Sequence, residues 1–163
     1  MAWVYISLGS NIDRETLTRA GVYALRQHYG ELILSSVYES EAVGFEGENF
    51  YNMVIVLQTD DAVQQVAKTL RQIEDEHGRD RTGPRFSSRT LDLDLLLYDD
   101  LIINEDRLQI PRDEILQRAF VLWPMAEVAA DLVHPQANKT YGELWDAFDK
   151  DKEMLEPIEF DFG

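Results

Sequence analysis

The chain has 163 residues, contains no cysteine and carries a formal net charge of −16 at pH 7, a length that suits one domain with a substantial hydrophobic core. The missing thiols exclude a disulfide scaffold, an iron–sulfur centre, a zinc site with thiolate ligands and a cysteine nucleophile. The excess of acid disfavours polyanion binding over a broad face, so any phosphate site must be locally basic.

The chain begins with a predicted strand followed by a predicted helix. Residues 2–8, AWVYISL, are apolar, β-branched and aromatic, a composition typical of a strand. Residues 12–29 carry apolar side chains near helical spacing, and Gly30 follows them as a helix end. Ser10 or Asn11 is a suitable N-cap, because both side chains can accept a backbone hydrogen bond.

Two further strands are predicted over residues 31–38 and 50–59, which are rich in β-branched and aromatic side chains. A loop of eleven residues that contains Gly44 and Gly47 separates them. A loop of this length between two strands is a candidate binding loop.

The rest of the chain adds three predicted helices and a fourth strand. The helices cover residues 60–77, 120–132 and 139–148, and the strand covers residues 90–98. The initial order of strand, helix, strand, strand, helix, strand is the split βαβ pattern of a ferredoxin-like sheet. We therefore expect an α+β fold, a mostly antiparallel sheet with helices packed on it in an αβα arrangement. A doubly wound parallel sheet is the alternative, which the two consecutive strands disfavour.

The C-terminal end of the chain is strongly acidic. Residues 146–163 hold seven acidic residues and two lysines, a local net charge of −5. We interpret this segment as a solvated, partly disordered end rather than a binding tail. We accordingly expect a single domain over residues 1–148 and an acidic tail over residues 149–163.

Membrane and export signals are missing from the sequence pattern. Apolar runs fall short of the roughly 20 residues that a membrane helix needs. The start, MAWVYISLGSN, has neither a basic leader nor a small-residue cleavage site. We expect a cytoplasmic monomer that binds small molecules, and neither nucleic acid nor a membrane.

One segment, RDRTGPRFSSR at residues 79–89, is strongly basic, with four arginines and one aspartate for a local net charge of +3. Gly83 and Pro84 indicate a loop at this point. The planar guanidinium group fits phosphate oxygens. Taken alone, such a loop is explained equally well by solvated surface and by an anion site.

The strand that follows alternates leucine with aspartate, so period-two geometry sends Asp92 and Asp94 to one face. Two adjacent carboxylates repel each other unless a cation lies between them. They suit a hard divalent cation whose coordination is completed by water and phosphate oxygens. The alternative is a solvated strand face, but the neighbouring arginines favour a phosphoryl-transfer site. The P-loop and GxGxxG signatures of other nucleotide sites do not occur.

Three segments resemble a known family: SLGSN at residues 7–11, RTLDLDLLLY at residues 89–98 and IPRDEILQRAFVLWPM at residues 110–125. They are similar to 6-hydroxymethyl-7,8-dihydropterin pyrophosphokinases of the folate pathway, and the similarity runs from about Trp3 to Trp145. The resemblance implies a ferredoxin-like fold and a transfer of pyrophosphate from ATP to the pterin hydroxymethyl group, with release of AMP. It also implies two Mg²⁺ ions, with ATP as co-substrate.

The resemblance assigns roles to individual residues. It implies that Asp92 and Asp94 bind the metal ions, and that they act in catalysis together with Arg79 and Arg89, which stabilise charge on the triphosphate. Nucleotide contacts are implied for Arg71, Glu74, Arg81, Arg85, Arg112 and Arg118. Pterin contacts are implied for Ser40, Val43, Asn52, Phe86 and Phe120.

The sequence also departs from the family pattern. Arg112 and Asp113 stand where the family usually has histidine followed by tyrosine or proline, and the loop at residues 41–49 carries three glutamates. Two alternatives therefore stay open: the same chemistry on a related pterin, or binding of a pterin or nucleotide without turnover. Retention of the carboxylate pair argues against the second, because a chain without turnover has no need of it.

Overall fold

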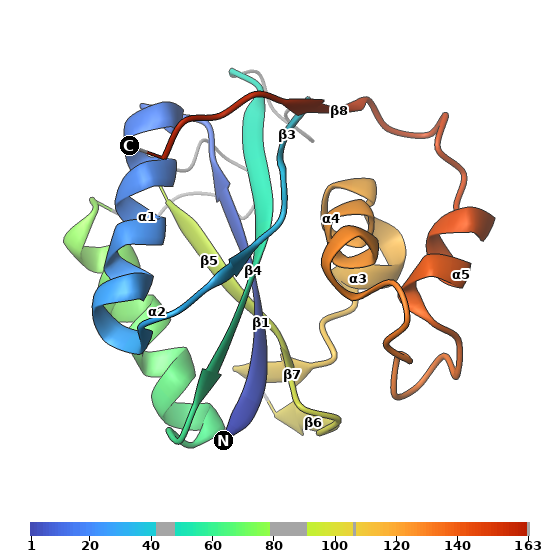
Figure 1. Cartoon of the computed structure of the whole chain (residues 1–163), viewed down its shortest axis with the longest axis horizontal. Helices are drawn as coiled ribbons and strands as arrows, with labels where there is room; N and C mark the ends of the chain where they lie inside the picture. Colours follow the sequence, from blue (N-terminus) through green and yellow to red (C-terminus); the bar gives the residue numbers. More distant parts are fainter. Residues whose placement is uncertain (42–47, 79–90, 106, 163) are drawn as a thin grey trace.

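The computed structural model describes residues 1–41, 48–78, 91–105 and 107–162. Its centre is an antiparallel sheet with the strand order β5–β1–β4–β3–β8, and β2 pairs with β4 beside this path (Figure 1). The strands of this sheet are β1 (Ala2–Ser10), β2 (Ile33–Leu34), β3 (Val37–Ser40), β4 (Phe50–Thr59), β5 (Asp92–Tyr98) and β8 (Leu155–Ile158). The antiparallel pairing rules out the doubly wound alternative and confirms the predicted α+β class.

Helices cover both faces of the sheet (Figure 1). One face packs against α1 (Arg14–Tyr29) and α2 (Val63–Glu76), and the other against α3 (Glu114–Gln117), α4 (Ala119–Ala129) and α5 (Tyr141–Ala147). Two apolar clusters result, one on each side of β1, β4 and β5. β1 and β4 are buried between two helical layers, which is consistent with their nearly continuous apolar sequences. None of the described helices is long and apolar enough to cross a membrane.

Several predicted elements have the expected bounds, and others need correction. The strand at residues 50–59 is confirmed as β4, and the helix at residues 60–77 begins later, as α2. The strand predicted over residues 31–38 divides into β2 and β3, because the chain leaves the pairing with β4 between them. A hairpin of β6 (Ile103–Glu105) and β7 (Leu108–Ile110) was not predicted.

The predicted N-cap of the first helix is wrong. The helix begins at Arg14, and Asp13 precedes it in a left-handed conformation with φ of 48°. Ser10 instead belongs to β1, and the Asn11 side chain donates a 3.0 Å hydrogen bond to the carbonyl oxygen of Glu48. The chain therefore turns away from the sheet before it becomes helical.

The expectation of a solvated, partly disordered C-terminal end is also wrong for the part that the structure describes. Leu155–Ile158 forms β8, which pairs with β3 at the edge of the sheet. Beyond it, the carbonyl of Asp161 accepts a 2.6 Å hydrogen bond from Arg19 of α1, and the ring of Phe160 packs edge-on against Tyr51. The segment thus crosses the sheet edge towards α1 (Figure 1).

Candidate active site

The carboxylates of Asp92 and Asp94 lie on one face of β5, as the alternation predicts. Leu93 and Leu95 are only 5% and 6% exposed and pack into the core under α1 and α2, which turns the two aspartates to the opposite face. β5 is an edge strand, so these side chains sit at the rim of the sheet. Burial of the leucines therefore fixes the orientation of both acids.

A row of residues crosses the sheet from this carboxylate pair. Asp92 is opposite Gly9 in β1, Gly9 is opposite Asn52 in β4, and Asn52 is opposite Tyr38 in β3. Residues directly opposite each other in neighbouring strands share a face. Gly9 lies against Asn52 in the middle of the row, since a Cβ there would be in van der Waals contact with Oδ1 of Asn52, at 3.4 Å.

The predicted pterin contacts Ser40 and Asn52 lie together at the far end of this row. The Asn52 amide donates a 2.7 Å hydrogen bond through Nδ2 to Oγ of Ser40, and both residues are buried. Phe120, a third predicted contact, is partly buried at the beginning of α4. The hydrogen bond to Ser40 therefore holds the amide of Asn52 in one orientation, with the backbone of Gly9 beside its oxygen.

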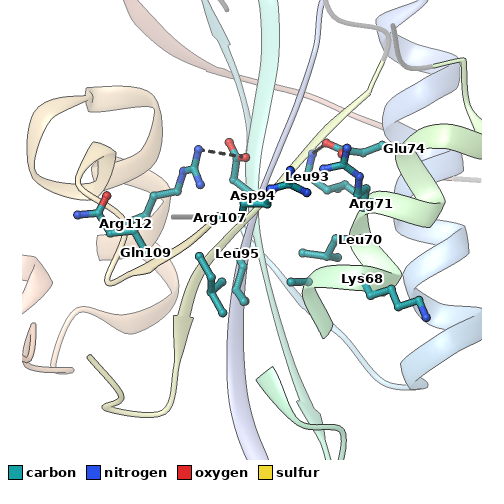
Figure 2. Close-up of a pocket in the computed structure, with 12 residues that line it drawn as sticks. Lys68, Leu70, Arg71, Glu74, Leu93, Asp94, Leu95, Arg107, Gln109 and Arg112 are labelled. Atoms are coloured by element: carbon teal, nitrogen blue, oxygen red, sulfur yellow. Dashed lines mark hydrogen bonds and ion pairs between the residues drawn. The ribbon is translucent and has the colours of Figure 1, made fainter. Parts of the chain in front are cut away.

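A pocket of about 420 Å³ opens at the free edge of β5, between α2 and the β6–β7 hairpin (Figure 2). Asp94, Arg71, Glu74 and Arg112 line it, so the structure brings together four of the residues predicted from the sequence. Lys68, Arg107 and Gln109 also line it and were not predicted. Lys68 lies three residues before Arg71 on the same helix face, so the helical spacing in the sequence could have indicated it. The short β6–β7 hairpin has no comparable pattern that would indicate Arg107, in its turn, or Gln109, in β7.

The pocket is basic although the chain is acidic. Among the described residues, four of its lining side chains are cationic, those of Lys68, Arg71, Arg107 and Arg112. Within the same described set, the lining carboxylates are those of Glu74 and Asp94. Glu74 is 7% exposed, and its Oε2 accepts a 2.8 Å hydrogen bond from the backbone N–H of Leu93, which fastens α2 to the edge strand. Such a pocket meets the requirement for a locally basic phosphate site.

Asp94 has a strongly perturbed environment. Burial, followed by the nearby charge of Asp92, raises the pKa of Asp94 well above its ordinary value, and the cationic Arg112 opposes this increase. The Arg112 guanidinium lies with Nη2 3.5 Å from Oδ1 of Asp94 and Nε 3.1 Å from Oε1 of Glu114. Both acids raise the pKa of Arg112 against the effect of its own burial. The carboxylate pair is therefore a place where added positive charge is stabilising.

The chemistry of the donor set fits a magnesium ion. The described residues contain no group of three or more histidine, cysteine, aspartate or glutamate side chains that could hold a metal. Mg²⁺ is commonly held by only one or two carboxylates, with waters and substrate phosphates as the other ligands. Asp92 and Asp94, beside a basic pocket, supply such a pair.

Other predicted residues are not brought into this pocket. Arg118 is not among the residues that line it, and its Nη1 lies 2.8 Å from Oε2 of Glu153 in the acidic C-terminal segment. The remaining predicted residues, Val43, Arg79, Arg81, Arg85, Phe86 and Arg89, lie outside the described residues.

Comparison with known proteins gives consistent matches over most of the chain. The family model described as 7,8-dihydro-6-hydroxymethylpterin-pyrophosphokinase (HPPK) matches residues 5–130. The 2-amino-4-hydroxy-6-hydroxymethyldihydropteridine pyrophosphokinase of Bacillus subtilis (strain 168) is 41% identical over 128 residues, which are 76% of each chain. The enzyme of the same name from Aquifex aeolicus (strain VF5) is 33% identical over 146 residues, which are 88% of this chain and 91% of the relative.

Solved structures give the same match at the level of the fold. An HPPK-DHPS in complex with substrates superposes with a TM-score of 0.72 at 11% identity, covering 93% of this chain. The Plasmodium falciparum HPPK-DHPS with SDX-DHP has a TM-score of 0.71 at 13% identity, again over 93% of this chain. The chain spans 44% and 45% of those two proteins, so it corresponds to less than half of each.

Proposed function

The chain belongs to the 7,8-dihydro-6-hydroxymethylpterin-pyrophosphokinase family, and from this premise we propose that it transfers pyrophosphate from ATP to 6-hydroxymethyl-7,8-dihydropterin in folate biosynthesis. One observation carries the proposal for the site. The Asp92–Asp94 pair stands between a basic pocket at the edge of β5 and the row that leads through Gly9 to Asn52.

This arrangement gives each substrate its own side of the carboxylate pair. The triphosphate of ATP lies in the pocket, where Arg71, Arg107 and Arg112 supply guanidinium groups for its oxygens. The pterin lies towards Asn52, whose amide offers both a donor and an acceptor for the polar edge of the ring. Gly9 places only backbone beside that amide, since a Cβ at this position would lie 3.4 Å from its Oδ1.

Asp92 and Asp94 hold Mg²⁺, two ions by the family resemblance. When bound there, Mg²⁺ supplies neutralisation of the charge on the phosphate oxygens. Asp92 and Asp94 fix the position of the metal at the boundary between the two substrates. The arginines that line the pocket bind the phosphate oxygens that the metal does not contact. Leu93 and Leu95 keep the strand seated in the core, so the acids do not turn away.

The reaction is an in-line displacement at the β-phosphorus. A new bond forms between the pterin hydroxymethyl oxygen and the β-phosphorus, and the bond from that phosphorus to the oxygen bridging it to the α-phosphorus breaks. AMP leaves with the electron pair, and the hydroxyl proton is released to water. The residues of the site contribute positioning and charge stabilisation, which supply most of the acceleration in phosphoryl transfer.

The test is a turnover assay with ATP, Mg²⁺ and 6-hydroxymethyl-7,8-dihydropterin, in which AMP and pyrophosphorylated pterin are measured. Asp94→Asn keeps the shape of the side chain but removes a charge, and we expect at least about a hundredfold loss of kcat/KM. Asp100→Asn, an exposed acid just after β5, is the matched control and should keep full activity.

The remaining outcomes distinguish the alternatives. Binding of the pterin without formation of AMP under any condition would contradict the proposed activity. Turnover that occurs only with a different pterin, and not with 6-hydroxymethyl-7,8-dihydropterin, would support the same chemistry on a related substrate. Full activity in Asp94→Asn would contradict the role of the carboxylate pair.

A further inference from the structure

Arg112 bridges a proposed metal ligand and a second acid. Its Nη2 lies 3.5 Å from Oδ1 of Asp94, and its Nε lies 3.1 Å from Oε1 of Glu114 (Figure 2 shows the contact with Asp94). All three side chains are between a quarter and about a third exposed; Asp94 and Arg112 line the pocket, and Glu114 lies beside Arg112. The guanidinium group therefore has room to move.

The backbone of Arg112 is fixed, in contrast to its side chain. Its N–H donates a 3.1 Å hydrogen bond to the carbonyl of Leu96 in β5, and its carbonyl accepts one of 3.2 Å from Ile115 in α3. These bonds hold the residue between the edge strand and the first helix of the opposite layer. Any movement of its charge must therefore come from rotation of the side chain about a fixed Cα.

The place that Arg112 occupies is one that a divalent cation needs. Asp94 presents its Oδ1 to the guanidinium, and a metal ion bound by the same carboxylate would bring two cationic groups within a few ångströms of each other. Like charges at that separation repel strongly at a partly buried site. A metal ion and Arg112 therefore compete for Asp94.

We propose that Arg112 is a positioning residue: it holds Asp94 while the metal is absent and transfers its charge to the nucleotide phosphates when a divalent cation takes its place. Its Nε contact with Glu114 is the pivot that keeps the guanidinium beside the pocket throughout. This inference rests on the proposed function, because it requires a nucleotide in the pocket that Arg112 lines.

The consequence is a coupling between two ligands. Metal alone must displace Arg112 without compensation, so it binds weakly. Metal together with a nucleotide gives the displaced guanidinium a new anionic partner, so each ligand strengthens the binding of the other. Replacing Arg112 with a neutral side chain should therefore change the two affinities in opposite directions.

The test is calorimetric titration of Arg112→Gln with Mg²⁺, first alone and then with a non-hydrolysable ATP analogue that has a methylene group between the α- and β-phosphorus. We expect the affinity for Mg²⁺ alone to increase about tenfold and the affinity for the analogue with Mg²⁺ to decrease about tenfold, within the usual range of coupling between sites. Neither readout depends on turnover.

Arg107→Gln is the matched control, because Arg107 lines the same pocket. Arg107→Gln should weaken binding of the analogue but leave the affinity for Mg²⁺ alone within about twofold of the wild-type value. This control removes one positive charge without removing the Asp94 contact, so it distinguishes the two effects. Arg112→Lys keeps the charge and should restore weak binding of Mg²⁺ alone. Thermal unfolding of each variant shows that it is folded.

An unchanged or lower affinity of Arg112→Gln for Mg²⁺ alone would overturn the inference, even if the analogue still binds. Loss of analogue binding by the wild-type chain is a different result: it would overturn the proposed function and the phosphate-binding half of this inference together. If Arg112 only supported the fold, its replacement would not raise the affinity for Mg²⁺ alone while it lowers the affinity for the analogue.

Discussion

Glu153 connects the acidic C-terminal segment to the helical layer, and its replacement tests whether that segment belongs to the fold. Oε1 accepts a 2.8 Å hydrogen bond from the backbone N–H of Ala119, the first residue of α4, and Oε2 lies 2.8 Å from Nη1 of Arg118. The Glu153 side chain is 15% exposed. Since Arg118 itself makes no side-chain cap at α4, Glu153 supplies the cap from a distant part of the chain.

The expected cost of Glu153→Ala follows from these two contacts. Loss of a carboxylate cap at a helix N-terminus costs about 0.5–2 kcal/mol. Loss of the ion pair adds about 1 kcal/mol, a modest amount because Arg118 is 31% exposed and water can solvate its guanidinium. We therefore expect the free energy of unfolding to fall by about 1.5–3 kcal/mol, which lowers Tm by about 3–12 °C in a chain of this size.

The assay is urea unfolding followed by circular dichroism, with Tm measured separately. Glu156→Ala is the control, because Glu156 lies in β8 of the same segment with an exposed side chain, and its replacement should change the stability by no more than about 0.5 kcal/mol. A Glu153→Ala variant as stable as the control would refute the reasoning. Residues 149–163 would then behave as the solvated tail that composition alone predicts.

Two further predictions concern other buried polar groups. Tyr38→Phe removes a 2.6 Å hydrogen bond from the tyrosine hydroxyl to Oε1 of Glu127, and it should lower the free energy of unfolding in urea by about 1 kcal/mol. Tyr23→Phe, at an exposed position, is the control and should cause no measurable change. Equal effects of the two substitutions would contradict this prediction. Burial lowers the pKa of His134 below its ordinary 6.5, so the unfolded chain binds a proton more readily and stability is lost as the pH falls below that value. The asparagine of His134→Asn can accept the same hydrogen bonds from the backbone N–H groups of Gln136 and Ala137. The free energy of unfolding of this variant should therefore decline less between pH 7 and pH 5 than that of the wild type. A parallel decline in the variant and the wild type would show that His134 is not responsible.

The elements that could be predicted from the sequence are those whose signal extends over many residues. β4 has ten residues with a nearly continuous apolar pattern, and its predicted bounds are confirmed. The apolar stripe of α2 likewise gave the helix, with an error of a few residues at its N-terminus. In both cases the local pattern and the tertiary burial agree, because these elements lie in the centre of the core.

The elements that were missed are short and depend on distant contacts. β6 and β7 have three residues each, α3 has four, and β8 has four with two exposed glutamate and proline positions. Such segments contain too few residues for a periodic pattern to be significant. β8 forms because β3 offers it an unpaired edge, a property of the assembled sheet that composition does not record.

The residues of the candidate site divide in the same way, into those that a local pattern predicts and those whose position depends on distant contacts. Alternation alone placed Asp92 and Asp94 on one face, since period-two geometry is local. The pairing of Arg112 with Asp94, and of Arg118 with Glu153, joins segments 18 and 35 residues apart, and it depends on how helices of the second layer meet the sheet edge. No local pattern determines which of several arginines reaches which acid.

The distribution of charge explains how a chain of net charge −16 can contain a locally basic pocket. Exposed charges are screened over about 8–10 Å at physiological ionic strength, so a phosphate in the pocket interacts mainly with the groups that line it. Those groups include four cations and two carboxylates. One carboxylate, Glu74, accepts a hydrogen bond from the backbone N–H of Leu93, and the other, Asp94, is paired with Arg112. If magnesium displaces Arg112 from Asp94 as proposed, the pocket would be most positive when the metal is bound. On the proposed mechanism, the groups that line the pocket, rather than the net charge of the chain, would favour a metal–nucleotide complex over free nucleotide.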